Sequence, residues 1–142
     1  MRIDFTIPGP PKGKARARTL KNGHSFTPAD TVAYENLVKL CYREKANGSA
    51  LIEGPVQVWI RAYFPIPKSA SKKRTEEMRT GALRPVVKPD CDNIAKIVCD
   101  ALNNIAYRDD SQVTCAVVVK EYADIPRVEV EIAKIMTNKR TK

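Results

Sequence analysis

The sequence predicts an α+β domain in which helices cover a mixed β-sheet, with elements in the order β-α-β-(α)-α-β-β. Three observations support this fold class. Several short segments alternate apolar and polar residues, as half-buried strands do, and two longer segments repeat apolar residues every three or four positions, as amphipathic helices do. No internal repeat is present. The chain of 142 residues is long enough for one core. We therefore expect a single compact domain over residues 1–136 and a basic, disordered tail at 137–142.

The first predicted elements are a strand, a loop and a helix. Residues 2–7, RIDFTI, alternate strictly and are followed by a proline, which ends a strand. Residues 8–23, PGPPKGKARARTLKNG, contain Pro, Gly and five basic residues without an apolar stripe, which predicts a basic loop. Thr27 as N-cap and Pro28 as the first helical residue begin a helix that runs towards Asn47.

The middle of the chain predicts a second strand and an exposed basic excursion. Residues 56–64, VQVWIRAYF, alternate again and end at a Pro-x-Pro sequence. Residues 68–88 hold seven basic and two acidic residues, with Ser69 or Ser71 available to cap a short helix. This excursion is either a solvated, flexible loop or a surface that binds an anionic partner.

The last predicted elements are a helix and two strands. From about Asp92 to Asn104 a single apolar stripe faces a polar one, which predicts an amphipathic helix. Residues 112–122 and 127–135 form the final strands. The first of these strands contains CAVVV, which is apolar on both faces and is typical of a central strand.

Charge is distributed unevenly along the chain. The sequence has 25 Lys and Arg against 16 Asp and Glu, for a net charge of +9 and a pI near 9.5. Five aspartates between Asp90 and Asp110 face only two basic residues, so that segment carries 2 − 5 = −3 and the rest sums to +12. Such a basic surface is typical of proteins that bind nucleic acid, although many small cationic proteins bind none.

Composition disfavours several classes of protein. No apolar run approaches the ~20 residues of a membrane span, and the N-terminus lacks the pattern of a signal peptide. We therefore expect a cytoplasmic protein without membrane association. The four cysteines form no close pair and His24 is the only histidine, which disfavours a zinc site and histidine-based catalysis. Carboxylate chemistry is favoured instead.

Four aspartates are candidates for a metal site. Asp90 and Asp92 stand two residues apart before the second long helix, so in extended backbone both side chains would point the same way. Asp109 and Asp110 precede a strand, where adjacent side chains point to opposite sides, so at most one of them joins the cluster. Oxygen donors without imidazole or paired thiolates favour Mg²⁺ or Mn²⁺. Alternatively, Asp92 caps the helix and Asp90 stabilises its dipole.

Lys96 lies one helical turn after Asp92. This spacing stabilises a helix through an ion pair, and it also places a cation where negative charge would develop on a phosphoryl group. Asp100, one turn further on, is expected to orient Lys96 rather than to bind metal. The residues alone therefore indicate a metal-dependent nuclease.

Two sequence motifs resemble a known family. KPDCDNIAKIVCDAL at 88–102, followed by AYRDDSQV at 106–113, is similar to the signature of the RusA-type Holliday-junction resolvases. These are homodimeric endodeoxyribonucleases of bacteria and their prophages that act in DNA recombination and repair. The segments PGPPKGKARAR, SFTP, FPIPKSASKK and KEYADIPRVEVEI also fit the family pattern. The resemblance implies one RusA-like nuclease domain over 1–136.

The resemblance also implies roles for individual residues. Asp90, Asp92 and Asp110 would hold Mg²⁺, for which Mn²⁺ could substitute, and Lys96 would stabilise developing charge or orient the attacking water. Asp109 is the alternative to Asp110, and we choose Asp110. The implied reaction is paired, Mg²⁺-dependent nicking of two opposed strands of a four-way DNA junction by a homodimer, without an organic cofactor.

The two basic segments supply the candidates for DNA backbone contacts. These candidates are Lys12, Lys14, Arg16, Arg18, Lys72, Lys73 and Arg74. Each of them could instead serve only solubility. Two rival functions stay open: a non-catalytic protein that binds branched DNA, and a metal nuclease that cuts flaps or single strands.

Overall fold

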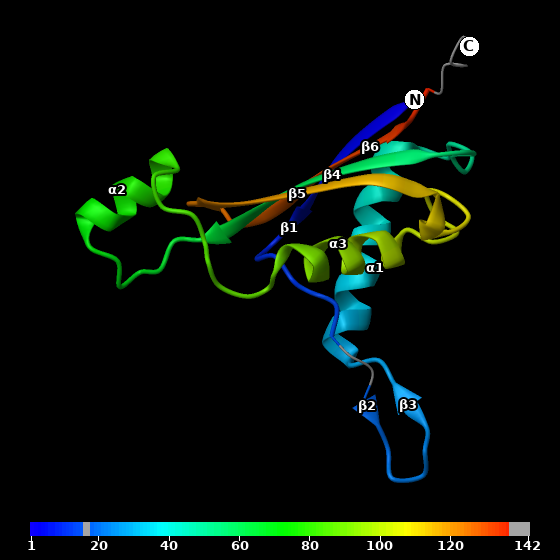
Figure 1. Ribbon diagram of the computed structural model, residues 1–142, viewed down its shortest axis with the longest axis horizontal. Coiled ribbons are helices and arrows are strands. Elements are labelled where there is room, and N and C mark those ends of the chain that lie inside the picture. The colour runs from blue at the N-terminus through cyan, green and yellow to red at the C-terminus, as the bar shows by residue number, and fades with distance from the viewer. Residues whose placement is uncertain (16–17, 137–142) are drawn as a thin grey trace, which may run out of the picture.

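The computed structural model describes residues 1–15 and 18–136, and it has the predicted α+β architecture. A mixed four-stranded sheet with strand order β1-β6-β4-β5 forms its centre. Its strands are β1 (Arg2–Pro8), β4 (Val56–Pro65), β5 (Val113–Ala123) and β6 (Arg127–Lys134). Helices α1 (Ala29–Ala46) and α3 (Cys91–Ala101) pack together against one face of this sheet (Figure 1).

Helix α2 (Lys72–Thr80) projects beyond one end of the sheet (Figure 1). Its N-cap is Ser71, whose hydroxyl accepts a 3.2 Å hydrogen bond from the Arg74 amide, so the prediction of a capped helix in this excursion is confirmed. Gly81 ends the helix at φ 86°, a conformation that favours glycine. The excursion is therefore a structured arm attached to the domain.

The prediction that β5 is a central strand is wrong. β4 pairs with β5 in parallel and with β6 in the antiparallel direction, so among residues 1–15 and 18–136 β5 has a neighbour on one side only. An apolar strand has the same sequence pattern whether or not its second edge is paired. Strand order depends on which strands meet after the helices pack, and the pattern does not encode that order.

The core lies between the sheet and the two long helices. Alternate residues of β4, Val56, Val58, Ile60 and Ala62, have no exposed surface, and they point towards the helices. Ile97 of α3 is equally buried. Each such Val or Ile side chain stabilises the fold by about 1.5–3 kcal/mol. The apolar stripe of α3 is therefore buried against the sheet, and the polar face of the helix points outwards.

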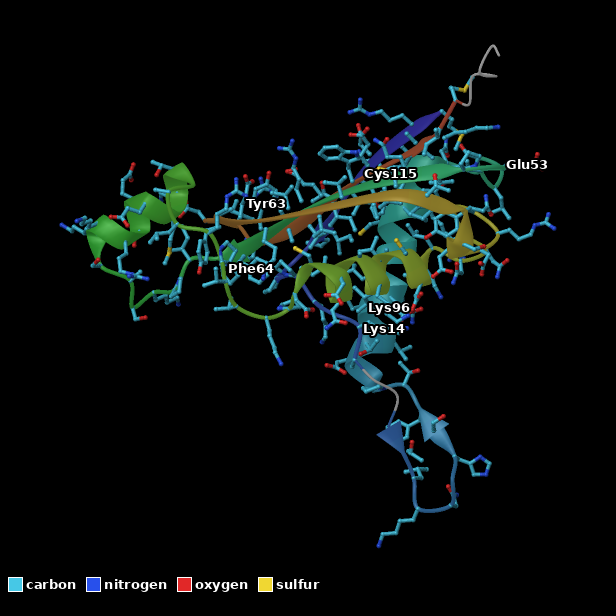
Figure 2. All side chains as sticks on the ribbon, viewed as in Figure 1. Lys14, Glu53, Tyr63, Phe64, Lys96 and Cys115 are labelled. Atoms are coloured by element: carbon cyan, nitrogen blue, oxygen red, sulfur yellow. The ribbon has the colours of Figure 1, made fainter. Side chains whose placement is uncertain are left out.

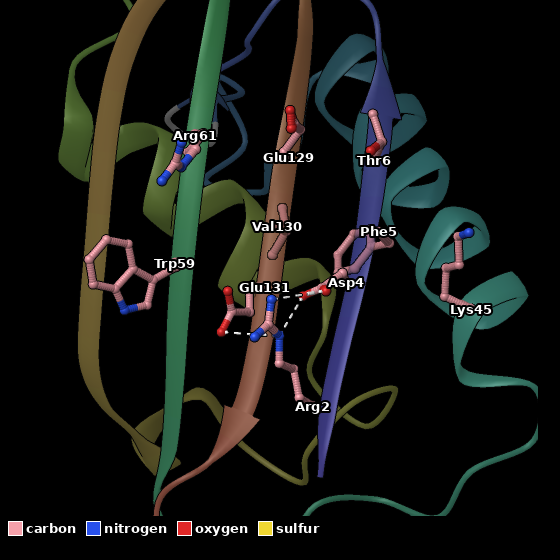
Figure 3. A pocket seen from close by; sticks show the side chains of 10 residues that line it. All are labelled: Arg2, Asp4, Phe5, Thr6, Lys45, Trp59, Arg61, Glu129, Val130 and Glu131. Carbon is pink, nitrogen blue, oxygen red and sulfur yellow. Dashed lines mark hydrogen bonds and ion pairs between the residues drawn. The ribbon is translucent and has the colours of Figure 1, made fainter.

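The other face of the sheet is largely polar. A hollow of about 470 Å³ lies there, and in it Arg2 pairs with Asp4 at 3.2 Å and with Glu131 at 3.4 Å. Figure 3 shows the side chains that line this hollow. Trp59 and Arg61 of β4 border the hollow. Because these side chains alternate with the buried residues, the hollow lies on the opposite side of the sheet from α3.

Three local predictions need correction. The segment 8–23 is not entirely loop, because β2 (Arg18–Thr19) pairs with β3 (Ser25–Phe26) in a small hairpin. Helix α1 begins at Ala29, with Pro28 in the N-cap position. Helix α3 begins at Cys91 and ends at Ala101, because tight turns replace the helix although the apolar pattern continues to Ile105. The predicted tail at 137–142 lies outside the described residues.

None of the helices in the described part of the chain combines the length and apolar character needed to cross a membrane.

Candidate active site

The outer face of α3 carries a row of charged side chains. Asp92, Lys96 and Asp100 follow one another at four-residue intervals, which places them on one side of the helix and spreads them over about 12 Å. The Lys96 Nζ lies 3.6 Å from the Asp100 Oδ2, so the expected pairing of these two side chains is present. Ile94 and Ile97 hold the opposite face in the core. The amphipathic pattern therefore fixes which way the charged row points.

Asp90 and Asp92 occupy the start of α3. Asp90 is the N-cap residue in extended backbone, and its side chain makes no capping hydrogen bond. Asp92 lies in the first helical turn. The prediction that Asp92 caps the helix is therefore wrong, and so is the prediction that Asp90 and Asp92 both have extended backbone. Both residues are exposed, and neither forms an ion pair with another described residue. Their carboxylates are accordingly available to a ligand.

The adjacent residues Asp109 and Asp110 have different surroundings. Asp109 caps the 3₁₀ helix η1 (Asp110–Gln112), and its carboxylate accepts a 3.0 Å hydrogen bond from the Ser111 amide. Hydrogen bonding by the Ser111 side chain, and then by its amide, lowers the pKa of Asp109. The Asp110 carboxyl approaches Asp100 closely enough to share a hydrogen bond, which raises the pKa of Asp110; partial burial adds to the rise. Asp110, rather than Asp109, therefore faces the charged row of α3.

Gln112 fixes this turn, although it was not among the predicted site residues. Its Oε1 accepts hydrogen bonds from the amides of Arg108 at 2.9 Å and Asp109 at 3.2 Å, while its Nε2 donates to the carbonyls of Ile52 at 2.9 Å and Gly54 at 3.0 Å. With Asp109 as N-cap, Gln112 completes a capping box. The spacing of an N-cap residue and a Gln three positions later was the sequence signal for this role.

Tyr107 attaches the same loop to the end of α3. Its side chain is fully buried, and its hydroxyl donates a 2.6 Å hydrogen bond to the Cys99 carbonyl. Burial raises the pKa of Tyr107, so the group stays a donor at neutral pH. Residues 107–112 are thus fixed at both ends, which holds Asp110 beside the helix.

The basic residues predicted to contact DNA lie in two regions. Lys72, Lys73 and Arg74 are exposed in the first turn of α2, on the projecting arm (Figure 1). In the N-terminal loop, the Lys12 Nζ lies 2.9 Å from the exposed carboxylate of Asp30.

The other three candidates come from the N-terminal segment, and one of them, Lys14, pairs with carboxylates of the domain. Arg16 lies outside the described residues, and Arg18 begins β2. Lys14 Nζ lies 2.7 Å from Glu35 Oε1 and 3.5 Å from Asp100 Oδ2.

The donor groups along α3 suit a hard divalent cation, because they are carboxylates without imidazole or paired thiolates. Within residues 1–15 and 18–136, however, no three His, Cys, Asp or Glu side chains gather into a metal-binding group. Asp100 and Asp110 meet near the C-terminal end of α3, whereas Asp90 and Asp92 lie at its N-terminal end. The grouping of Asp90, Asp92 and Asp110 around one ion therefore stays a prediction.

Comparison with known proteins defines the class and then the family. A family model described as Endodeoxyribonuclease RusA matches residues 8–133, which include both the acidic motif and the charged row of α3. The class is accordingly that of endodeoxyribonucleases, hydrolases that act on DNA. The chain belongs to the RusA family. It is also 41% identical over 138 residues to the uncharacterized protein YqaN of Bacillus subtilis strain 168, covering 94% of this chain and 96% of that protein.

Proposed function

We propose that the protein resolves Holliday junctions by paired, symmetric nicking with Mg²⁺, in DNA recombination and repair. The observation that carries this proposal is the family match, which includes the acidic motif, together with the exposed carboxylates and lysine on one face of α3. The basic residues of the rest of the chain would attract DNA. Because the proposed substrate is bacterial DNA, we expect the protein to act in the cytoplasm.

The proposed catalytic groups are Asp90, Asp92, Asp110 and Lys96. The three carboxylates would hold the divalent ion. When bound, such an ion would lower the pKa of a coordinated water and polarise the scissile phosphate. Lys96 keeps 61% of its side chain exposed, so its ammonium group can reach a bound phosphodiester and stabilise the negative charge that develops there. Mn²⁺ is expected to substitute for Mg²⁺, since both favour oxygen donors.

The arm that contains α2 is proposed to bind the DNA backbone. Lys72, Lys73 and Arg74 stand in the first helical turn, which contains no acidic residue. Cations at a helix N-terminus are unfavourable for the helix itself, but they add to the positive potential that attracts a phosphate. Lys12, Arg16 and Arg18 are proposed as further backbone contacts. Such contacts position DNA and do not read its sequence.

Two nicks in opposed strands call for two active sites. We propose a homodimer, because a two-fold symmetric protein matches the symmetry of a four-way junction. No organic cofactor is needed for this hydrolysis.

The proposal is tested with a synthetic four-way junction, with Mg²⁺ and in EDTA. The wild type should nick opposed strands symmetrically only with Mg²⁺. Asp92→Asn and Asp110→Asn should bind the junction as the wild type does but lose cleavage by a factor on the order of 100. Asp109→Asn is the matched control, because Asn also caps helices well; it should keep most of the activity.

Two results of this assay would contradict the proposal. Tight binding by the wild type without metal-dependent cleavage would favour the non-catalytic binding protein. Equal cleavage of linear, flap or single-stranded DNA would favour the other metal nuclease.

A further inference from the structure

We infer that Lys14 is a positioning residue of the active site. Its ammonium group, held by Glu35, keeps the Asp100 carboxylate in place. Asp100 in turn contacts the proposed catalytic residues Lys96 and Asp110. The inference rests on the proposed function, and it assigns Lys14 a role within the domain instead of the DNA contact predicted from the sequence.

The first support is the position of the Lys14 ammonium group between α1 and α3. It lies 2.7 Å from Glu35 Oε1 on α1 and 3.5 Å from Asp100 Oδ2 on α3. The side chains of Lys14, Glu35 and Asp100 are only 21%, 16% and 20% exposed, which makes these the least exposed ion pairs in the described part of the chain. Figure 2 shows Lys14 and Lys96 at the place where the two helices meet. Such partly buried pairs are weakly screened.

The second support is the close approach of the loop backbone to α3. The Lys14 amide donates a 3.1 Å hydrogen bond to the Asn93 carbonyl. A Cβ atom at Gly13 would lie 2.9 Å from the Pro89 Cβ and 3.0 Å from the Asn93 Cβ, so only glycine fits there. The loop is therefore docked against the segment that contains Asp90 and Asp92, and it reaches the other end of α3 through the Lys14 side chain.

The third support is the balance of charge around Asp100. Glu35 and Asp100 both pair with Lys14, and the Asp110 carboxyl lies within hydrogen-bonding reach of Asp100, so Asp100 has negative groups beside it. Among the described residues, the cations that pair with Asp100 are Lys14 and Lys96, and Lys96 is mostly exposed. Without Lys14, like charges would drive the Asp100 side chain towards solvent. The ion pair that orients Lys96 would then be lost.

Lys14→Met separates positioning from DNA binding. If Lys14 is a positioning residue, the single-turnover cleavage rate of the variant at saturating protein should fall by roughly tenfold or more, because small displacements of catalytic groups slow the reaction strongly. The junction Kd in EDTA and its salt dependence should stay at the wild-type values. A phosphate contact would instead weaken binding and lower the salt slope by about one unit, with the saturated rate unchanged. That pattern would overturn the inference.

Two more variants exclude a merely structural role. Lys14→Arg should recover most of the rate, since a guanidinium can pair with both carboxylates. Gly13→Ala should lower the saturated rate although Lys14 is present, because the added methyl group pushes the loop away from α3. Lys39→Met removes the same charge from α1 and is the control; it should keep the wild-type rate. A lower Tm with an unchanged rate for the folded Lys14→Met protein would overturn the inference.

A wild type that cuts no DNA at all would refute the proposed function, and a second measurement then decides on Lys14. Backbone amide resonances of Asp100 and Asp110 should move in Lys14→Met and stay fixed in Lys39→Met, without DNA present. Unchanged resonances in both variants would show that Lys14 does not position Asp100.

Discussion

Asp109 and Asp110 are neighbours in the chain, yet their carboxylates have opposite surroundings. The side chain and the amide of Ser111 favour the charged form of the Asp109 carboxylate, whereas the Asp110 carboxyl meets another carboxyl, that of Asp100. Gln112 holds the turn that creates this difference. One residue thus stabilises the turn, and the other is available for chemistry.

This difference predicts a pH-dependent effect of Asp110→Asn on the metal-free protein. Because the folded-state pKa of Asp110 is raised above its usual 3.8, ionisation weakens the native state as pH rises through that pKa. Asn cannot ionise, so the variant should be the more stable protein at pH 7, and this difference should vanish well below pH 3.8. Because solvent screens this site, the difference in the free energy of unfolding between the variant and the wild type should stay under about 1 kcal/mol.

Urea unfolding in EDTA at pH 3 and pH 7 measures the effect. Asp109→Asn is the control, and its effect should have the opposite sign, because the pKa of Asp109 is lowered and its charged form stabilises the fold above pH 3.8. If Asp110→Asn stabilised the protein more at pH 3 than at pH 7, the placement of the Asp110 carboxyl beside Asp100 would be contradicted.

At the scale of the element, α2 combines a well-formed helix with an unfavourable charge arrangement. Ser71 caps its start and Gly81 ends it, while Lys72, Lys73 and Arg74 occupy the turn where acidic residues would be preferred. Near its C-terminal end, Arg79 pairs with Asp124 at 3.1 Å and connects the helix to the end of β5. The arm is held in place, and its basic first turn is exposed.

Replacing Lys72, Lys73 and Arg74 together with Gln should weaken junction binding at all sequences alike. If all three contact phosphates, the slope of log Kd against log salt should decrease by about three units, because each neutralised phosphate contributes about 0.9. The saturated cleavage rate should stay near the wild-type value. The matched control replaces Lys39, Arg43 and Lys45 of α1 with Gln, which removes the same charge from a helix outside the arm. Equal binding by the two triple variants would refute the role of the arm.

At the scale of the whole molecule, paired nicking requires two active sites in one complex. We predict that the protein in solution has twice the monomer mass of 15.9 kDa, measurable by light scattering. Heterodimers of wild type and Asp92→Asn should nick a junction once, because only one site is active. A monomer at concentrations that saturate cleavage would contradict the homodimer.

The sequence by itself determined most of the long helices and strands and the nuclease family. Alternation identified β1 and β4, the apolar stripe identified α3, and the choice of Ser69 or Ser71 as a cap predicted α2, because these signals come from residues close together in the chain. The same local reading placed carboxylates and a lysine on one helix, and the acidic motif pointed to the nuclease family that the comparison then confirmed.

Only the tertiary structure decided how distant segments meet. It made β5 an edge strand, turned Asp110 towards Asp100, and placed Lys14 between Glu35 and Asp100. These contacts join residues that are far apart in sequence, and they depend on how the helices pack on the sheet. Side-chain periodicity reports which face of an element is buried, but it carries no information on which other element covers that face.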